Sequence, residues 1–515
     1  MTEVIRRTLR DSSAMRWAML ILLSGLTFST YWFQDFFSGL KGLMETEMGF
    51  SSEEFGRILG LTTVANMCGM IIIGGIMLDK WGIRIAGIVF GGIAVLGGAI
   101  SAMGAAGIFG ADKSTMLNAI IVGRILFGSG LEVICVVATR TIVKWFKGYD
   151  LALAMAINMG FGRLGSAMGT ALSLDIAGGH VSPAVTFAAG LIGVSLIMFL
   201  IYTVFDVKLD RQEKAISSEK SGEVCDTDED FKFSDLITLI KNKSFLYIAL
   251  LCVTFYAAIF PFMQYAPDLL INKFGFTQEL PQAGEVILFG SKAIGAASVY
   301  IVFFLFAILF AVVPNNFENK NFRTLFKIGA LAGFLIYLFI MKDILAIWLN
   351  NGAKTASLIP LGTIIFTPIF GNIVDKKGKA ASLMILGSLL LIFAHVSLSV
   401  LHSVVIAYFG LLSLGVAFSL VPAAMWPSVA KIVAENRLGT AYATMFTLQN
   451  WGLGLFFWGI GALLDFVNQG IPEGQAKDYT IPILVLVGCG VISIFLSFLL
   501  KKADRAQNYG LELPS

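Results

Sequence analysis

The chain has 515 residues, of which 57% are hydrophobic and 14% charged, with a mean hydropathy of +0.81 and a net charge of +3. This composition excludes a soluble globular domain, and the small net charge gives no reason to expect a nucleic-acid partner. Five scattered cysteines and three histidines give no disulfide framework and no metal-binding spacing. The sequence therefore predicts an all-α protein that crosses a membrane many times, without a cofactor or a metal.

Apolar segments long enough to cross a bilayer recur along the chain in two groups. The first group has six segments, at residues 16–40, 55–78, 83–109, 118–145, 150–175 and 182–205. The second has eight, at residues 244–271, 287–313, 324–349, 354–374, 381–400, 403–432, 439–467 and 481–500. Between them, the charged residues of the stretch 207–243 indicate a solvated linker. We therefore expect fourteen transmembrane helices.

Lysine and arginine residues gather in the loops on one side of these segments. They include Arg10, Arg16, Arg84, Lys144, Lys147, Lys377, Lys379, Lys431, Lys501, Lys502 and Arg505. Basic residues near the ends of transmembrane helices favour the cytoplasmic side. The pattern predicts that both termini and the linker are cytoplasmic.

Two short motifs indicate an internal repeat. "GIMLDKWG" at residues 75–82 and "GNIVDKKG" at 371–378 share two glycines, an aspartate and a lysine at the same spacing, and both lie where an apolar segment meets a loop on the basic side. Two copies in matching positions predict two homologous halves. Around them we expect gating residues, namely Asp79, Lys80, Arg84, Asp375 and Lys376.

The second copy of the motif lies much farther from the start of its half than the first, which indicates an inserted pair of helices. The resulting domain prediction is an N-terminal six-helix bundle (1–206), a linker (207–243), a C-terminal six-helix bundle (244–280 and 351–502), an inserted hairpin (281–350) and a tail (503–515).

Glu132 and Arg163 are the strongest candidates for a binding site. Each lies near the middle of an apolar segment, and counted from Lys147 in the turn between them, Glu132 lies 15 residues back and Arg163 lies 16 residues on. Two antiparallel helices that rise about 1.5 Å per residue would carry both to nearly equal depth. A charge at that depth is costly unless it serves a site or a partner. The alternative is that Glu132 and Arg163 neutralise each other.

Further polar and aromatic residues at membrane depth are weaker candidates. Packing explains Tyr256, Gln264 and Trp426 taken singly better than substrate binding does. Asp35 could face either the cavity or outer water, and Gln449 and Asn450 are stronger as a group because adjacent amides in hydrocarbon need partners. Those assigned to the substrate site are Asp35, Tyr256, Gln264, Trp426, Gln449 and Asn450. Arg124 is assigned a conformational role, with hydrogen bonds to the carbonyls of a neighbouring helix as the alternative.

The loops "DKWGIR" and "DKKGK" and the segment "GRILFGSG" resemble signatures of the major facilitator superfamily. "WFKGYDLALAMAINMGFGRLGSAMG", "IFPFMQYAPDLLINKFGF" and "AMWPSVAKIVAENRLGTAYATMFTLQN" are similar to the branch that contains lysosomal dipeptide transporters. The resemblance implies two six-helix bundles and alternating-access transport of dipeptides, with Glu132 and Arg163 holding the two ends of the peptide.

The chemistry of the two residues is consistent with that function. The ammonium and carboxylate of a dipeptide lie roughly 6–7 Å apart; Glu132 would accept hydrogen bonds from the ammonium, and the planar fork of Arg163 would hold the carboxylate. The alternatives are an organic-anion transporter centred on Arg163, and a sensor or assembly partner that does not transport. No phosphate loop, nucleophile elbow or metal cluster is present, so we do not expect an enzyme.

The remaining predictions concern coupling, compartment and partners. Helix 1 lacks the Glu-x-x-Glu-Arg motif of proton-coupled peptide transporters, so we expect facilitated diffusion or weak proton coupling through Asp35 or Glu132. The inserted hairpin and the absence of a dileucine signal in the N-terminal tail favour a bacterial cytoplasmic membrane. We expect a monomer in the lipid bilayer, with an accessory subunit as the alternative.

Overall fold

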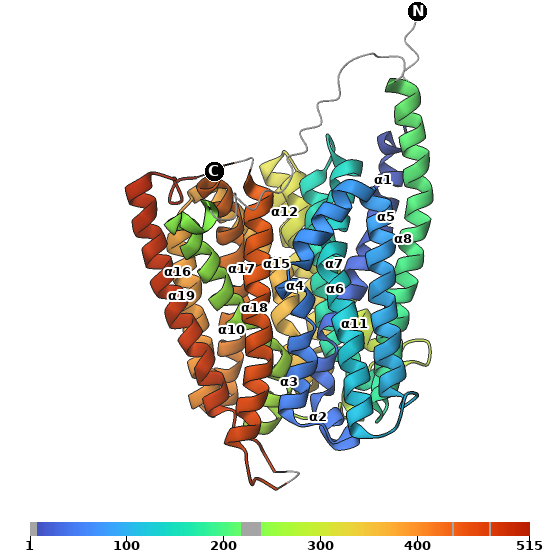
Figure 1. The fold of residues 1–515 in the computed structure, drawn as a ribbon, viewed down its shortest axis with the longest axis vertical. Helices are drawn as coiled ribbons and strands as arrows, with labels where there is room; N and C mark the ends of the chain where they lie inside the picture. The colour runs from blue at the N-terminus through green and yellow to red at the C-terminus, as the bar shows by residue number, and fades with distance from the viewer. Residues whose placement is uncertain (1–7, 218–237, 435–436, 473–474, 515) are drawn as a thin grey trace, which may run out of the picture.

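The computed structural model describes residues 8–217, 238–434, 437–472 and 475–514. Its helices stand side by side in two bundles, which we call the N-half and the C-half (Figure 1). Eleven helices within these ranges are long and apolar enough to cross a membrane. The predicted all-helical polytopic membrane fold is confirmed, whereas the number of fourteen spans stays a prediction.

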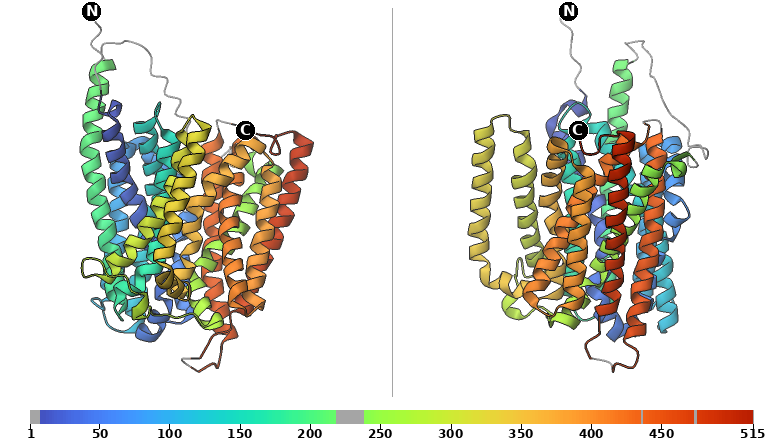
Figure 2. Two further views of the ribbon diagram at one scale, coloured as in Figure 1. Left: turned by 180° about the vertical axis from the view of Figure 1, so that it is seen from behind. Right: turned by 90° about the vertical axis from the view of Figure 1, so that its left-hand side faces the viewer.

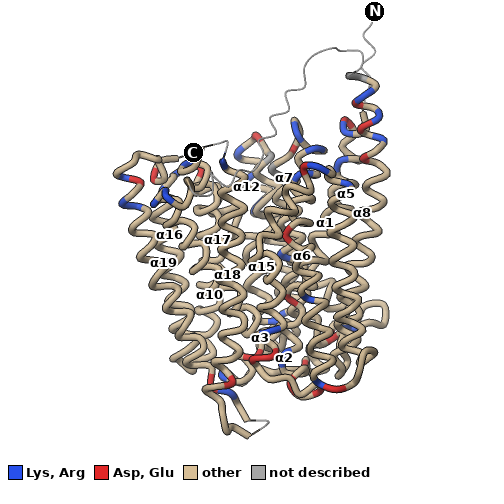
Figure 3. Tube along the Cα trace, viewed as in Figure 1, with Lys and Arg blue, Asp and Glu red and all other residues tan. Residues whose placement is uncertain are grey.

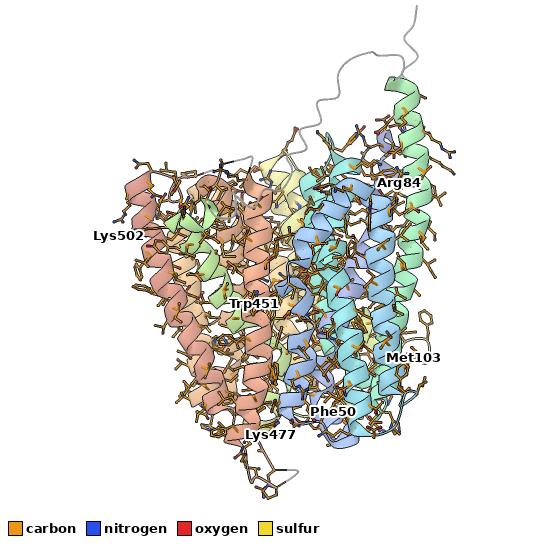
Figure 4. All side chains as sticks on the ribbon, in the orientation of Figure 1. Phe50, Arg84, Met103, Trp451, Lys477 and Lys502 are labelled. Carbon is orange, nitrogen blue, oxygen red and sulfur yellow. The ribbon has the colours of Figure 1, made fainter. Side chains whose placement is uncertain are left out.

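Charged residues gather at the two ends of the bundles and are sparse between them (Figure 3). Arg84 and Lys502 lie at one end, which we call the basic face, and Phe50 and Lys477 lie at the opposite end, which we call the far face (Figure 4). This distribution is the one that a bilayer imposes, because ionised groups are stable in water and costly in hydrocarbon.

The N-half comprises eight helices within the described residues: α1 (Ser13–Asp35), α2 (Phe37–Met48), α3 (Ser52–Leu61), α4 (Val64–Met67), α5 (Met70–Ala105), α6 (Lys113–Phe146), α7 (Leu151–Ala177) and α8 (Val181–Ser217). The expected span 55–78 is divided among α3, α4 and the start of α5, and α5 breaks at Gly82 (φ +76°), where the second expected span, 83–109, begins. α8 continues to Ser217, so the stretch expected as linker begins as helix; residues 218–237 of that linker lie outside the described ranges.

The C-half follows the same plan. Its helices are α10 (Lys243–Phe274), α14 (Gly352–Ala356), α15 (Leu358–Lys377), α16 (Ala380–Val400), α17 (Val404–Ile432), α18 (Leu438–Val467) and α19 (Thr480–Gln507). Prolines stand inside α10, α15 and α17, at Pro261, Pro267, Pro368, Pro422 and Pro427. Each proline removes one backbone hydrogen-bond donor from its helix.

Close packing in the N-half depends on small residues of the "GRILFGSG" segment in α6. A Cβ atom added at Gly128 would lie 1.8 Å from the backbone oxygen of Thr62, at the end of α3. Only glycine lets the two backbones approach this closely. The contact holds α6 firmly against α3 and so fixes the depth of the residues that follow Gly128, including Glu132.

The inserted hairpin lies against one side of the two bundles. It consists of α11 (Lys292–Ala307), the π-helical turn η3 (Ile308–Val312), the 3-10 turn η4 (Val313–Asn316), α12 (Lys320–Ile340) and α13 (Lys342–Leu349). α11 packs against both α7 of the N-half and α15 of the C-half. α12 stands outside, at the left edge of the right-hand view in Figure 2, and has no buried residue. Stacked rings of Phe306 and Phe334, 3.8 Å apart, join it to α11.

Candidate functional site

Glu132 and Arg163 project from two neighbouring helices of the N-half. Glu132 lies in α6 and Arg163 in α7, and both side chains are half-buried. The Cζ atom of Arg163 lies 4.4 Å from the centre of the Phe418 ring in α17, so the guanidinium reaches across to the C-half. Arg163 thus lies at the seam where the halves meet.

The charged groups of Glu132 and Arg163 are not paired with each other in this structure. Within the described ranges, neither side chain takes part in an ion pair closer than 4.0 Å or in a hydrogen bond. The mutual neutralisation considered from the sequence is therefore absent from this conformation. Unsatisfied charges of opposite sign at one depth can hold the two ends of a zwitterion.

Tyr31 of α1 adds a hydroxyl to the N-half side of the site. A Cβ atom added at Gly162 of α7, the residue before Arg163, would lie 3.0 Å from a ring carbon of Tyr31, so the phenol packs beside Arg163. The sequence analysis did not name Tyr31. Its position one helical turn before Asp35 puts both residues on the same face of α1, which is the signal that could have found it.

The C-half contributes a group of five aromatic residues, which we call the aromatic wall: Tyr256, Phe260, Phe418, Trp426 and Phe446. The Trp426 indole N–H donates a hydrogen bond of 3.0 Å to the Tyr256 hydroxyl, and Trp426 stacks on Phe446 at 4.8 Å. Tyr256 stacks on Phe260 at 5.5 Å, and Phe260 meets Phe418 edge-on at 5.4 Å. The wall therefore extends without a break from Arg163 to α18.

Two of the five wall residues, Tyr256 and Trp426, were named from the sequence because their polar atoms and neighbouring prolines mark them. The three phenylalanines were missed. A phenylalanine in an apolar segment carries no signal of the direction in which it points, and only the packing of α10, α17 and α18 reveals it.

The amides of Gln449 and Asn450 are satisfied inside the C-half. The Cys252 thiol donates to Gln449 Oε1 at 3.5 Å, and Asn450 Nδ2 donates to the backbone oxygen of Phe446 at 2.9 Å. Both side chains are buried. They support α18 behind the aromatic wall, and no described contact links them to Glu132 or Arg163.

Asp35 joins the halves instead of standing in open water. It is buried near the end of α1 and accepts a hydrogen bond of 2.6 Å from Gln264 Nε2 of α10 and another from the Ser166 hydroxyl of α7. The other amide atom of the same glutamine, Oε1, is buried without a partner. Asp35 and Gln264 therefore form one polar contact across the seam.

Buried ion pairs hold the halves together at the far face. Lys41 of α2 is fully buried and lies 2.7 Å from Asp268 of α10 and 2.6 Å from Glu45. Lys477 of the C-half reaches Glu45 at 2.7 Å. The sequence analysis did not single out this cluster, although a lysine and an aspartate within or at the end of apolar segments are candidates by default.

A second buried pair closes the same face beside the inserted hairpin. Lys354 of α14 pairs with Asp175 of α7 and also donates a hydrogen bond of 2.9 Å to the backbone oxygen of Ala171. A cavity of about 340 Å³ opens next to this pair, bounded partly by Glu285 and Lys292 of the insert. Neither Glu132 nor Arg163 lines it.

At the basic face, ion pairs form within each half. Asp79 pairs with Arg140, and Arg84 lies 2.8 Å from Asp206 and also contacts Asp210. The other predicted gating residues of the loops, Lys80, Asp375 and Lys376, are exposed. In the parts of the chain that the structure describes, no ion pair crosses between the halves at this face.

Arg124 is fully buried in α6, and among the described residues it has no ion pair closer than 4.0 Å. It donates to the backbone oxygen of Phe33 at 2.5 Å, to that of Gln34 at 3.4 Å and to the Thr62 hydroxyl at 3.0 Å. The rings of Phe33 and Phe127 lie about 5.5 Å from its guanidinium carbon. In this conformation Arg124 fastens α6 to α1, and its conformational role stays a prediction.

Comparison with known proteins gives relatives over nearly the whole chain. Proteins named lysosomal dipeptide transporter MFSD1 match from Danio rerio (25% identity over 96% of this chain and 88% of the relative) and Homo sapiens (24% over 97% and 88%). The match therefore spans nearly the whole of this chain and most of each relative.

Solved structures with a similar fold include the nucleoside transporter NupG (TM-score 0.57, 14% identity, 94% of this chain and 99% of that one) and the xylose transporter XylE from E. coli in an inward open conformation (TM-score 0.58, 12% identity, 95% and 96%). They share the two-bundle arrangement of the helices. A model of the Major Facilitator Superfamily matches residues 23–359. The chain is therefore an integral, multi-pass membrane protein that belongs to the major facilitator superfamily, as its paired loop motifs predicted.

Proposed function

We propose that the protein moves dipeptides or similar small zwitterions across the membrane by alternating access. The observation that supports the proposal is that Glu132 and Arg163, on neighbouring helices, carry opposite charges and are not paired with each other. The names of the MFSD1 relatives support the same substrate class. The superfamily is one of membrane transporters and not a class of enzymes.

In this proposal Glu132 and Arg163 each bind one end of the peptide. Glu132 accepts hydrogen bonds from the ammonium group of the peptide, and Arg163 holds the carboxylate with two parallel N–H donors. Phe418 keeps the guanidinium in place by cation–π contact at 4.4 Å. The aromatic wall then offers an apolar surface to the side chains of the peptide. Its polar groups are the Tyr256 hydroxyl and the Trp426 indole N–H.

The halves would alternate by exchanging the far-face contacts for contacts at the basic face. In this structure the buried pairs Lys41–Asp268 and Lys354–Asp175 close the far face. In the proposed cycle this conformation would open the site toward the basic face, which we assign to the cytoplasm because basic residues gather there. The bacterial cytoplasmic membrane and the monomeric state stay predictions, and the curated relatives carry lysosomal names.

Ligand-induced thermal stabilisation of the purified protein tests the substrate class, because a ligand that binds only the folded state must raise apparent stability. We expect free dipeptides to stabilise, and end-blocked dipeptides to fail. Glu132→Gln and Arg163→Ala should each abolish the effect. Asp343→Asn and Arg211→Ala, which change exposed charges outside the site, are the matched controls and should retain it.

Two outcomes would redirect the proposal. If only carboxylates stabilise, and Glu132→Gln leaves their effect intact, the protein is an organic-anion transporter centred on Arg163. If no solute stabilises it and a protein partner co-purifies in fixed ratio, it is a sensor or assembly partner. Strong uphill uptake driven by a pH gradient in liposomes would contradict facilitated diffusion or weak proton coupling.

Phe418 provides a finer test of how Arg163 is held. Phe418→Ala removes the ring beneath the guanidinium, and a cation–π contact at a partly buried site contributes about 0.5–2 kcal/mol. We expect dipeptide binding to weaken by about two- to thirtyfold, measured by titration calorimetry. Phe409→Ala, on the exposed side of the same helix, is the control and should leave binding unchanged.

A further inference from the structure

The last residues of the chain fold back onto the basic face of the C-half. α19 ends at Gln507, and Asn508 takes a left-handed conformation (φ +55°) that reverses the chain. The side chain of Leu511 is then fully buried, and its backbone N–H donates to Asp504 Oδ1 of α19 at 3.0 Å. The segment 508–514 is thus anchored to its own bundle.

This segment supplies the first turn of α16 with the hydrogen-bond partners that a helix lacks at its N-terminus. The residue before α16, Lys379, has a left-handed backbone and provides no side-chain cap. Its N–H donates to the backbone oxygen of Glu512 at 3.1 Å, and the N–H of Ala380 donates to that of Leu511 at 2.9 Å. The N–H and hydroxyl of Ser382 donate to the Glu512 carboxylate at 2.9 and 2.7 Å.

Lysines of two other helices hold the same segment. Lys501 of α19 lies 3.5 Å from Glu512 Oε2 and donates to the Ser382 hydroxyl at 2.5 Å. Lys431, at the end of α17, donates to the backbone oxygens of Gly510 at 3.1 Å and Leu513 at 3.2 Å. Segments from α16, α17 and α19 therefore meet on one short stretch of chain.

The second repeat motif is shaped to accept this stretch. Gly378, its last residue, has φ +65°, and a Cβ atom added there would lie 2.3 Å from the backbone carbon of Leu513. Gly82, the equivalent residue of the first motif, also has positive φ (+76°), but a Cβ atom there would meet nothing within 4 Å. Among the described residues, none approaches the first glycine on this side, whereas the segment 508–514 packs against the second.

We propose that the segment 508–514 is a clasp that caps α16 and ties it to α17 and α19. The clasp keeps the basic face of the C-half together as one body while the two halves rock. The helix cap of α16 thus comes from residues far away in the sequence and not from the residue before the helix. The segment 508–514 therefore helps to hold the moving half together. The effect of the clasp on transport rests on the proposed function, whereas its capping role does not.

Hydrogen exchange of the purified full-length protein tests the clasp without any substrate. Leu511→Asp places a charge in the buried anchor site, and Leu513→Asp makes the same change at a largely exposed side chain two residues on. We expect exchange of the first-turn amides of α16 to rise about five- to tenfold in Leu511→Asp, as for a lost helix cap. Leu513→Asp should leave it unchanged.

Glu512→Gln provides a milder second variant, since the amide keeps one acceptor for Ser382 but loses the charge that faces Lys501. It should raise the same exchange by a smaller factor. Unchanged exchange in Leu511→Asp, in a protein that remains folded by circular dichroism, would overturn the clasp. If dipeptides do not stabilise the wild-type protein, the proposed function is overturned, but the hydrogen-exchange test of the clasp is unaffected.

Discussion

The two faces of the protein use ion pairs in different ways. At the far face, Lys41–Asp268 and Lys354–Asp175 join the N-half to the C-half, and both lysine side chains are at most 1% exposed. At the basic face, Arg84–Asp206 joins parts of the same half, and the arginine side chain is 33% exposed. The far face is therefore closed between the halves, while each half is tied to itself at the basic face.

This difference indicates which ion pairs must separate during the proposed transport cycle. A pair that crosses the seam must separate when the far face opens, whereas a pair within one half can persist throughout the cycle. Removing one partner of a buried ion pair leaves the other charge uncompensated and is strongly destabilising. Exposed pairs contribute little, because water and salt screen them.

The largest expected effect is at the far face. Lys41→Met leaves the Asp268 carboxylate buried without its main counter-charge, and we expect the far-face-closed state to lose about 3–5 kcal/mol. The midpoint of thermal unfolding should fall, and a cysteine placed in the seam should become reactive to reagents added from the far side. Adding Asp268→Leu to Lys41→Met should restore most of the stability.

Lys292→Met is the matched control for that prediction. Lys292 pairs with Glu285 at the same face, but the side chain of Lys292 is 59% exposed. Both partners belong to the inserted hairpin, so this pair does not join the two halves. Its removal should cost less than about 1 kcal/mol. Equal losses in the two variants would mean that burial does not distinguish the cross-seam pair.

A smaller effect is expected at the basic face. Arg84→Gln removes one partner of Asp206, but Lys144 still holds that carboxylate at 2.8 Å. We expect a loss of about 0.5–1 kcal/mol in urea unfolding, with no change in seam accessibility from the far side. Opening of the far face in Arg84→Gln would contradict the division of tasks between the faces.

The smallest effect is a pH dependence of the clasp. Burial raises the pKa of Glu512, but hydrogen bonds from Ser382 and the nearby Lys501 outweigh it, so the pKa lies below the ordinary value of 4.5. Stability from Glu512 is therefore complete above pH 4.5 and is lost as the pH falls through the lowered pKa. The other groups that face the segment are Lys431 and Asp504.

We expect exchange of the α16 first-turn amides, corrected for the intrinsic effect of pH, to rise on acidification below pH 4.5. Glu512→Gln, which does not titrate, should remove this rise. A rise of equal size in Glu512→Gln would assign it to another group.

Much of the fold could be predicted from the sequence, because a bilayer imposes a simple rule on every span. The apolar segments, the repeated motifs and the inserted pair of helices all follow from hydropathy and spacing. The ends of helices followed less well: α8 continues into the expected linker, and the expected span 55–78 is broken into α3, α4 and the start of α5. A solvated helix and a break between short helices leave no sharp trace in hydropathy.

The site could be predicted only in part. Glu132 and Arg163 stand out because charge is rare at membrane depth, and their placement on neighbouring helices follows from counting residues. Phe418 and Lys41 could not be assigned in the same way. Their roles depend on which residue of the other half lies opposite, and that pairing is a property of the packed halves and not of either segment.

The repeated glycine shows what a duplicated motif preserves. Gly82 and Gly378 both have positive φ at the same place in their motifs, yet among the described residues only Gly378 has a chain segment packed against it. The two motifs therefore share a backbone bend and differ in what contacts it. The same bend can be exposed in one half and can bind a segment of the chain in the other.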